Sequence, residues 1–169
     1  QEPPATAGVD GAGGLGLVVG SRAMEEALAK ARAAGAGIVV VRNSRHFGAA
    51  GYYSMMAVTQ GMIGIAMTNA RPRVAPTFGA KPAVGTNPIS IAAPTREEPP
   101  FLLDMATSTA AQGKIFIAQR LKKSIPQGWA LDKDGNPTTN PDSVATLRPL
   151  GSTPETSNYT GYGLGVAVD

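Results

Sequence analysis

The single histidine of this sequence, His46, stands where an acid–base group would be expected. It follows the apolar run 38–41, and Gly48 and Gly51 beyond it would let a ligand come close to the backbone. Proteins of the α/β class place chemistry at the carboxyl ends of strands, and an imidazole exchanges protons with hydroxyl and carbonyl groups near neutral pH. His46 is therefore a candidate catalytic residue. The alternative is a surface histidine that starts the next helix.

Asp104 is the second candidate, because it ends the apolar run 101–103. A carboxylate at the end of a buried strand needs a partner or solvent, since burying it alone is costly. It could orient His46 and favour the charged imidazole, or it could bind a hydroxyl of a cofactor. The alternative is a cap for the helix expected over 109–121, a role that Ser108 could equally fill.

Two polar turns flank expected strands and could hold phosphate or ribose. Thr68 and Asn69 follow one apolar run, and Thr86 and Asn87 precede another. Their hydroxyl, amide and backbone groups are suitable donors for such a ligand. Taken from the residues alone, ordinary turn chemistry explains both segments better.

The segment Gly11–Gly16 matches the pattern G-x-G-x-x-G of dinucleotide-binding loops. That pattern works when a strand precedes it and a helix opens at its last glycine. Residues 3–10 make a poor strand, the next helix is expected only after Ser21, and no acid lies near residue 36. The sequence therefore favours a flexible glycine turn.

The elements that must position these residues alternate in type. Ser21 is the expected cap of the first helix, and Gly35 its expected end. A long irregular loop is expected over 69–87, turn-rich chain over 122–157, and a helix or strand from 162 to 168. Helices are predicted over 22–34, 49–60 and 109–121, and strands over 38–41, 62–68, 89–93 and 101–105, the first of them buried. This order predicts a mixed α/β sheet.

Composition narrows the classes of protein. The 169 residues are 43% hydrophobic and 16% charged, which argues against disorder and for one domain. Cysteine is absent, so disulfides, thiolate catalysis and cysteine-bound zinc are excluded, and no metal site is expected. The net charge of +3 is scattered, which disfavours nucleic-acid binding. No apolar run reaches about 18 residues, and the first residues, Gln-Glu-Pro-Pro, have no basic start and no apolar signal core. A cytoplasmic protein without membrane contact is therefore expected, although a secreted chain after processing would look the same.

Several segments together resemble one enzyme family. They occur in order along nearly the whole chain, at residues 41–53, 64–70, 85–89, 103–108, 113–115, 125–130 and 149–151. The first reads Val-Arg-Asn-Ser-Arg-His-Phe-Gly-Ala-Ala-Gly-Tyr-Tyr, and the fourth Leu-Asp-Met-Ala-Thr-Ser. As a set they resemble the malate/L-lactate dehydrogenase type 2 family, whose members oxidise or reduce malate, lactate, sulfolactate, ureidoglycolate and related compounds.

This resemblance implies a fold and a cofactor. The fold would be α/β, with a mixed, largely antiparallel sheet flanked by helices that binds NAD or NADP without a Rossmann fold. Residues 1–169 would form a single cofactor-binding domain of a homodimeric oxidoreductase that acts on a small 2-hydroxyacid.

The resemblance also assigns residues. His46 corresponds to the acid–base group, with Asp104 as a second catalytic candidate. The expected cofactor contacts are Thr68, Asn69, Thr86, Asn87, Asp104, Met105, Ala106, Thr160 and Gly161. Thr160 stands where members of the family commonly carry a lysine at the cofactor, which bears on cofactor preference.

Members of the family are about twice this length. Their N-terminal helical segment, with a Ser-His-Gly motif and an arginine that grips the substrate carboxylate, has no counterpart here, and neither has their C-terminal part. Arg45, Arg71 and Arg73 are weak substitutes for that arginine. The alternative function is accordingly a truncated, catalytically inactive domain that binds cofactor or merely oligomerises through exposed apolar surface.

Overall fold

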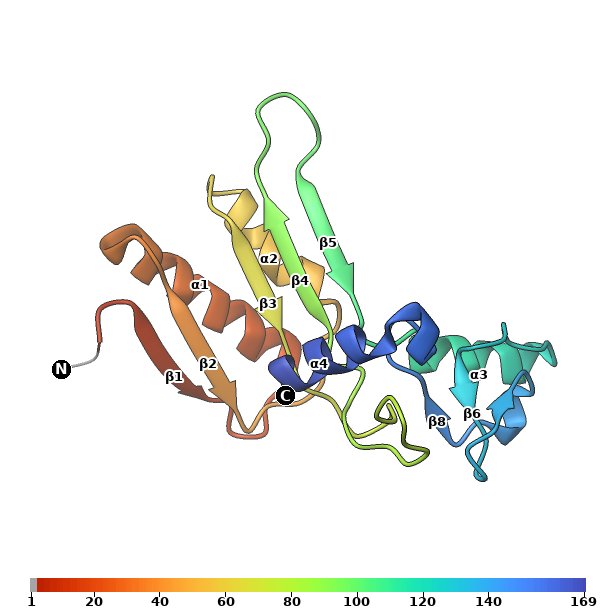
Figure 1. Ribbon diagram of the computed structural model, residues 1–169. Helices are drawn as coiled ribbons and strands as arrows, with labels where there is room; N and C mark the ends of the chain where they lie inside the picture. The colour runs from red at the N-terminus through yellow and green to blue at the C-terminus, as the bar shows by residue number, and fades with distance from the viewer. Residues whose placement is uncertain (1–2) are drawn as a thin grey trace. The chain divides into compact units, whose positions relative to one another are not determined.

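The computed structural model describes residues 3–169, which divide into two compact units (Figure 1). The first unit comprises the described residues up to Ala66 together with Ser90–Asp104, and the second comprises Met67–Ile89 and Met105–Asp169. None of the helices in residues 3–169 is both long and apolar enough to cross a membrane.

The first unit opens with a β–α–β arrangement. Strand β1 (Thr6–Asp10) pairs in parallel with β2 (Ile38–Arg42), and helix α1 (Gly16–Ala34) connects them and packs against both. The helix ends at Gly35, which adopts the left-handed conformation with φ 84°. Parallel strands need such a crossover connection, and a helix provides it.

Three expectations for this region were wrong. Residues 6–10 form a strand, although residues 3–10 were expected to make a poor one. The first helix begins at Gly16, and Ser21 lies inside it, where its hydroxyl donates to the carbonyl of Leu17 at 2.8 Å. Glycines and β-branched residues are weak helix formers, so the first turns carried little local signal. Strand β2 has no buried residue, since Ile38 and Val40 remain 60% and 67% exposed.

A three-stranded sheet completes the first unit. Its order is β3 (Gly64–Met67), β4 (Ile89–Ala93) and β5 (Phe101–Met105), and adjacent strands run in opposite directions (Figure 1). The residues of β4 and β5 are those that the sequence predicts. With the parallel pair β1–β2, this sheet confirms the expected mixed α/β class, in which antiparallel pairing predominates.

Helix α2 (Ala50–Val58) packs closely on this sheet. A side chain at Gly64 would collide with the carbonyl of Ser54, so the glycine lets helix and strand backbones touch. The hydroxyls of Ser54 and Ser90, both fully buried, lie 2.7 Å apart, and Ser90 Oγ donates to the Leu103 carbonyl at 2.8 Å. Helix and sheet are thus joined by backbone contact and by a satisfied polar network.

The second unit has one apolar core. Helix α3 (Gln112–Leu121) and helix α4 (Asn158–Val168) accompany a small antiparallel sheet of β6 (Ala130–Leu131), β7 (Pro137–Thr138) and β8 (Thr146–Leu147). Two 3₁₀ turns, η1 (Pro141–Ser143) and η2 (Pro154–Thr156), lie in the region expected to be turn-rich. The buried cluster consists of Val74, Val84, Ile115, Ala118, Ile125, Ala130 and Leu147.

The irregular segment 69–87 is ordered by this core. Val74 bridges to Val84 within the segment and to Leu147 of β8, and both valines are buried. The C-terminal apolar segment is a helix, which settles the choice that the sequence left open. The expected helix over 109–121 begins at Gln112.

Candidate functional site

His46 lies in the loop between β2 and α2, as the sequence predicts. Its side chain is exposed, forms no hydrogen bond or ion pair with any described residue, and lines neither the hollow beside Arg148 nor the one beside Val40. In particular, no hydrogen bond joins it to Asp104 within residues 3–169. The structure therefore offers an imidazole whose nitrogen atoms are available to a ligand, while its catalytic role stays a prediction.

The loop that carries His46 is tied down on the side of β1. The carboxylate of Asp10 accepts hydrogen bonds from Asn43 Nδ2 at 3.1 Å and from the Ala12 amide at 2.9 Å, and it pairs with Arg42 Nε at 3.2 Å. The Ala12 amide, with Asn43 and Arg42 as smaller contributions, lowers the pKa of Asp10 below its usual value. An acid at the end of β1 thus stays charged and holds the start of the His46 loop.

Asp104 serves a helix, although a different one from that expected. Its Oδ2 accepts a hydrogen bond from the Gly51 amide at 2.8 Å, in the first turn of α2. A carboxylate at this position satisfies a free N–H and interacts favourably with the helix dipole. The cap expected for the 109–121 helix is absent, since Ala111 occupies that position and Ser108 Oγ donates to the Ala110 carbonyl.

The geometry leaves Asp104 able to do more than cap. The residue is exposed, and its second carboxylate oxygen has no partner among the described residues. A side chain at Gly51 would come within 2.6 Å of Oδ2, so the glycine permits this close approach. Both Asp104 and His46 belong to the first unit.

The two polar turns lie in the second unit, and their side chains differ in how accessible they are to a ligand. Asn87 is fully buried, and its side chain accepts from the Ala70 amide at 2.9 Å and donates to the Gly165 carbonyl at 2.8 Å. Thr86 accepts at its carbonyl from the Thr107 amide at 2.9 Å. These contacts make Asn87 a brace that joins the segment 69–87 to α4.

Thr68 and Asn69 are more open. The Thr68 hydroxyl is half-buried and donates locally to the Asn69 carbonyl at 3.1 Å, whereas the Asn69 side chain is exposed and free of hydrogen bonds to the described residues. The Asn69 amide is therefore accessible to a polar ligand.

The remaining predicted cofactor residues differ in burial: some pack within the unit and one is exposed at its surface. Met105 and Ala106 are half-buried. Gly161 is buried where a side chain would strike the Leu150 carbonyl, and Thr160 is exposed on α4, with its hydroxyl donating to the Ser157 carbonyl at 2.7 Å. Gly161 thus shapes the backbone, whereas Thr160 presents a hydroxyl at the surface.

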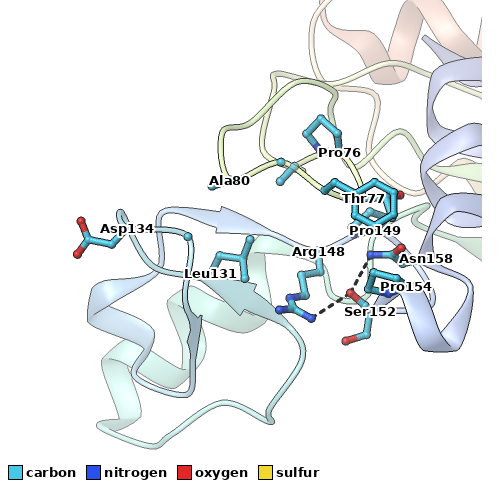
Figure 2. A pocket seen from close by; sticks show the side chains of 14 residues that line it. Pro76, Thr77, Ala80, Leu131, Asp134, Arg148, Pro149, Ser152, Pro154 and Asn158 are labelled. Carbon is cyan, nitrogen blue, oxygen red and sulfur yellow. Dashed lines mark hydrogen bonds between the residues drawn. The ribbon is translucent and has the colours of Figure 1, made fainter.

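The second unit also contains a hollow of about 310 Å³ that the sequence did not indicate (Figure 2). Arg148 Nη1 and Asn158 Nδ2 both donate to the carbonyl of Ser152, at 3.2 and 3.1 Å. Asn158 Oδ1 and Thr77 Oγ1 are buried without a partner within residues 3–169. The lining comes from three separate segments of chain, so no local pattern could have revealed it.

The glycine motif has the surroundings that its sequence context argued against. Strand β1 directly precedes Gly11, and α1 opens at Gly16. The reasons for setting the motif aside, a missing strand and a late helix, were therefore wrong. Its amides are nevertheless engaged within the chain: Gly11 donates to Arg42, Gly13 to Asn43 and Gly14 to Gly11.

Comparison with known proteins identifies relatives over the whole chain. Residues 1–169 match the malate/L-lactate dehydrogenase family. The chain is 51% identical to malate dehydrogenase of Pyrococcus horikoshii and 48% identical to L-sulfolactate dehydrogenase of Methanocaldococcus jannaschii, in each case with 100% of this chain aligned to 48% of the relative. The chain thus spans about half the length of the curated relatives that it matches.

Comparison with solved structures leads to the same family. The crystal structure of malate dehydrogenase from Entamoeba histolytica superposes with a TM-score of 0.93 at 42% identity, over 99% of this chain and 49% of that one. Sulfolactate dehydrogenase from Methanocaldococcus jannaschii gives a TM-score of 0.87 at 49% identity, over 99% of this chain and 47% of that one. The fold is therefore that of mixed α/β dehydrogenases acting on hydroxyacids. The chain belongs to the malate/L-lactate dehydrogenase family, as its sequence motifs predict.

Proposed function

We propose that this chain carries the acid–base group and cofactor-binding residues of an NAD- or NADP-dependent 2-hydroxyacid dehydrogenase, with malate or sulfolactate as the leading substrates. Family membership supports the class of reaction, and the two most informative relatives are named for these substrates. The observation that carries the proposal within the structure is the unpaired imidazole of His46 in an anchored loop.

The chemistry assigned to His46 is proton transfer. In oxidation, the O–H bond of the substrate breaks and His46 takes its proton, while the adjacent C–H bond gives up a hydride; in reduction the imidazolium returns the proton to the carbonyl oxygen. A bound nicotinamide ring supplies or accepts that hydride. The exposed ring of His46 can meet a substrate hydroxyl without breaking any contact to the described residues.

Each unit, taken by itself, offers polar groups of the kind that contact a dinucleotide. In the first, Asp104 retains one free carboxylate oxygen, which would accept a hydrogen bond from a ribose hydroxyl. In the second, the exposed amide of Asn69 can both donate and accept. Thr68, Met105 and Ala106 lie beside these residues in sequence and complete the proposed contacts. Asn87 and Gly161, whose groups are engaged by the chain, would instead hold the backbone in shape.

The choice of cofactor belongs to the same proposal. One relative is named for NADP(+), a sulfolactate dehydrogenase of Chromohalobacter salexigens, and another for NAD(+), a ureidoglycolate dehydrogenase of Escherichia coli O157:H7. We therefore include both cofactors. Thr160, which is neutral, provides no cation at its position for a 2′-phosphate.

His46→Asn tests the assignment, because asparagine keeps polarity but does not exchange protons near neutral pH. We expect kcat for malate or sulfolactate oxidation to fall by about 10²- to 10⁴-fold, while the Kd for NADH or NADPH, measured by fluorescence, changes little. Lys123→Gln, at an exposed position of the second unit, is the control and should behave as wild type. Retention of most of the turnover by the asparagine variant would remove His46 from the mechanism.

The measurements should be made on the 169-residue chain and on any longer natural protein that contains it. NADH binding without turnover by the chain alone, beside an active longer protein, would mean that the substrate-binding groups lie outside these residues. Binding without turnover in both would favour the inactive cofactor-binding domain.

A further inference from the structure

The glycine-rich segment Gly11–Gly16 lies directly against the loop that carries His46. The amide of Gly11 donates to the Arg42 carbonyl and that of Gly13 to the Asn43 carbonyl, both at 2.8 Å, and the Arg45 amide donates back to the Gly14 carbonyl at 3.3 Å. Backbone bonds therefore run in both directions between the two loops.

These bonds engage part of the donor set that a phosphate would need. A dinucleotide-binding loop presents its free amides to a pyrophosphate. Here the amides of Gly11, Ala12, Gly13 and Gly14 all donate to atoms of the chain, Ala12 to the Asp10 carboxylate. The motif has the strand and helix of a phosphate loop on either side, but its first four amides are engaged within the chain, two of them by the start of the His46 loop.

The last glycine of the motif has no room for a side chain. A Cβ atom at Gly16 would collide with the Arg45 carbonyl and would lie 2.5 Å from the carbonyl oxygen of His46 and 2.6 Å from its carbonyl carbon. Real Cβ atoms essentially never come that close to backbone atoms, so a methyl group there must displace the His46 backbone. A Cβ at Gly11 would likewise lie 2.8 Å from the Asn43 carbonyl.

The loop is also held, at Phe47, by Tyr53 of α2. The Tyr53 ring is 2% exposed and stacks on Phe47 with a centroid distance of 4.8 Å, and its hydroxyl donates to the Phe47 carbonyl. Burial raises the pKa of Tyr53, which keeps the phenol protonated as a donor. Gly20 makes this possible, because a Cβ there would lie 2.8 Å from the Tyr53 ring.

We propose that the glycine motif is a positioning device for His46, in which Gly16 holds the backbone at Arg45 and His46 and Tyr53 holds it at Phe47. This inference rests on the proposed acid–base role of His46, and it assigns positioning roles to two residues that act through the His46 backbone. It also gives the G-x-G-x-x-G sequence a role that does not require a bound phosphate.

Gly16→Ala and Tyr53→Phe test the two contacts that hold the His46 loop. The matched control is Gly8→Ala in β1, because nothing lies within 4 Å of a Cβ built at that glycine. His46 is the only histidine of the 169-residue chain, so the NMR signal of its ring protons reports its surroundings without ambiguity. Turnover and NADH binding are measured in parallel on the natural protein that contains these residues.

Gly16→Ala should shift the His46 signal and lower kcat by about ten- to a hundredfold, because a displacement near 1 Å is costly to proton transfer. Tyr53→Phe removes a single hydrogen bond and should lower kcat by about fivefold. In both variants the Kd for NADH should change by less than about twofold, so that the loss falls on kcat. Gly8→Ala should match wild type in every measurement.

The proposal fails if both variants leave the His46 signal and kcat at wild-type values, or if Gly8→Ala reproduces their effects. Should Gly16→Ala not fold, Tyr53→Phe decides the matter alone, since it keeps the buried ring. A shifted His46 signal with unchanged kcat also overturns the proposal. If turnover additionally survives His46→Asn, the fault lies in the acid–base assignment; if His46→Asn abolishes it, the fault lies in the positioning role.

Discussion

Asp104 permits a test that separates a structural role from a functional one. Its carboxylate accepts the Gly51 amide at 2.8 Å in the first turn of α2 and has one oxygen to spare. Asp104→Ala removes the acceptor and the charge together, whereas Asp104→Asn removes only the charge. The pair of variants therefore isolates the hydrogen bond from the electrostatic contribution.

The expected losses in the free energy of unfolding follow from these contacts of Asp104. Loss of a side-chain cap costs about 1 kcal/mol, and loss of a negative charge at an exposed helix N-terminus costs about 0.3–1 kcal/mol. Asp104→Ala should therefore lower the free energy of unfolding by about 1–2 kcal/mol, and Asp104→Asn by about half of that or less. For a chain of this size, such losses correspond to a fall in Tm of about 2–8 °C for the alanine variant.

The assay combines unfolding in urea with NADH titration. If Asp104 also binds a ribose hydroxyl, Asp104→Asn should weaken NADH binding more than its small loss of stability would suggest, because its neutral oxygen is a weaker acceptor than a carboxylate. Equal destabilisation by both variants would refute the capping argument. Unchanged NADH affinity in Asp104→Asn would remove the residue from the cofactor contacts and leave it as a cap.

Two further predictions concern buried and acidic groups. Asn87→Ala should cost about 2–4 kcal/mol in urea unfolding, because the Ala70 amide and Gly165 carbonyl both lose their partner, whereas the exposed control Asn69→Ala should cost little. The pKa of Asp10 is lowered in the folded protein. Its contribution to the free energy of unfolding is therefore complete at pH values above its unfolded-state pKa near 3.8, and it is lost as the pH falls through the folded-state pKa. The rate of hydrogen exchange at the Ala12 amide, divided by the rate in Asp10→Asn at the same pH, should therefore rise only below about pH 3.8. A rise in that ratio already above pH 5 would contradict the prediction.

Much of the fold could be predicted where local chemistry decides it. Strands β4 and β5 were predicted to the residue, because apolar and β-branched runs bounded by Pro-rich turns leave few alternatives. Gly35 ended α1 as expected. The motif containing His46 placed that residue correctly after β2.

The elements and residue roles that the sequence did not predict share a physical cause. Strand β1 contains Ala7 and Gly8, which have weak strand preference, and it exists because β2 pairs with it through backbone bonds. The first turn of α1 is likewise stabilised by tertiary contact more than by its residues. The roles of Asp104 and Asn87 depend on partners 53 and 17 residues away, and their distance in sequence hides such pairs from any local pattern.

The contacts of Gly64 and Gly161 also bear on how aligned relatives should be interpreted. At both positions a methyl group would strike a carbonyl oxygen, so substitution is barred by steric exclusion between main chains. Invariance at such sites would report packing and carry no information about turnover. A search for active-site residues by evolutionary constraint alone would select these glycines alongside the reacting groups, and only coordinates separate the two.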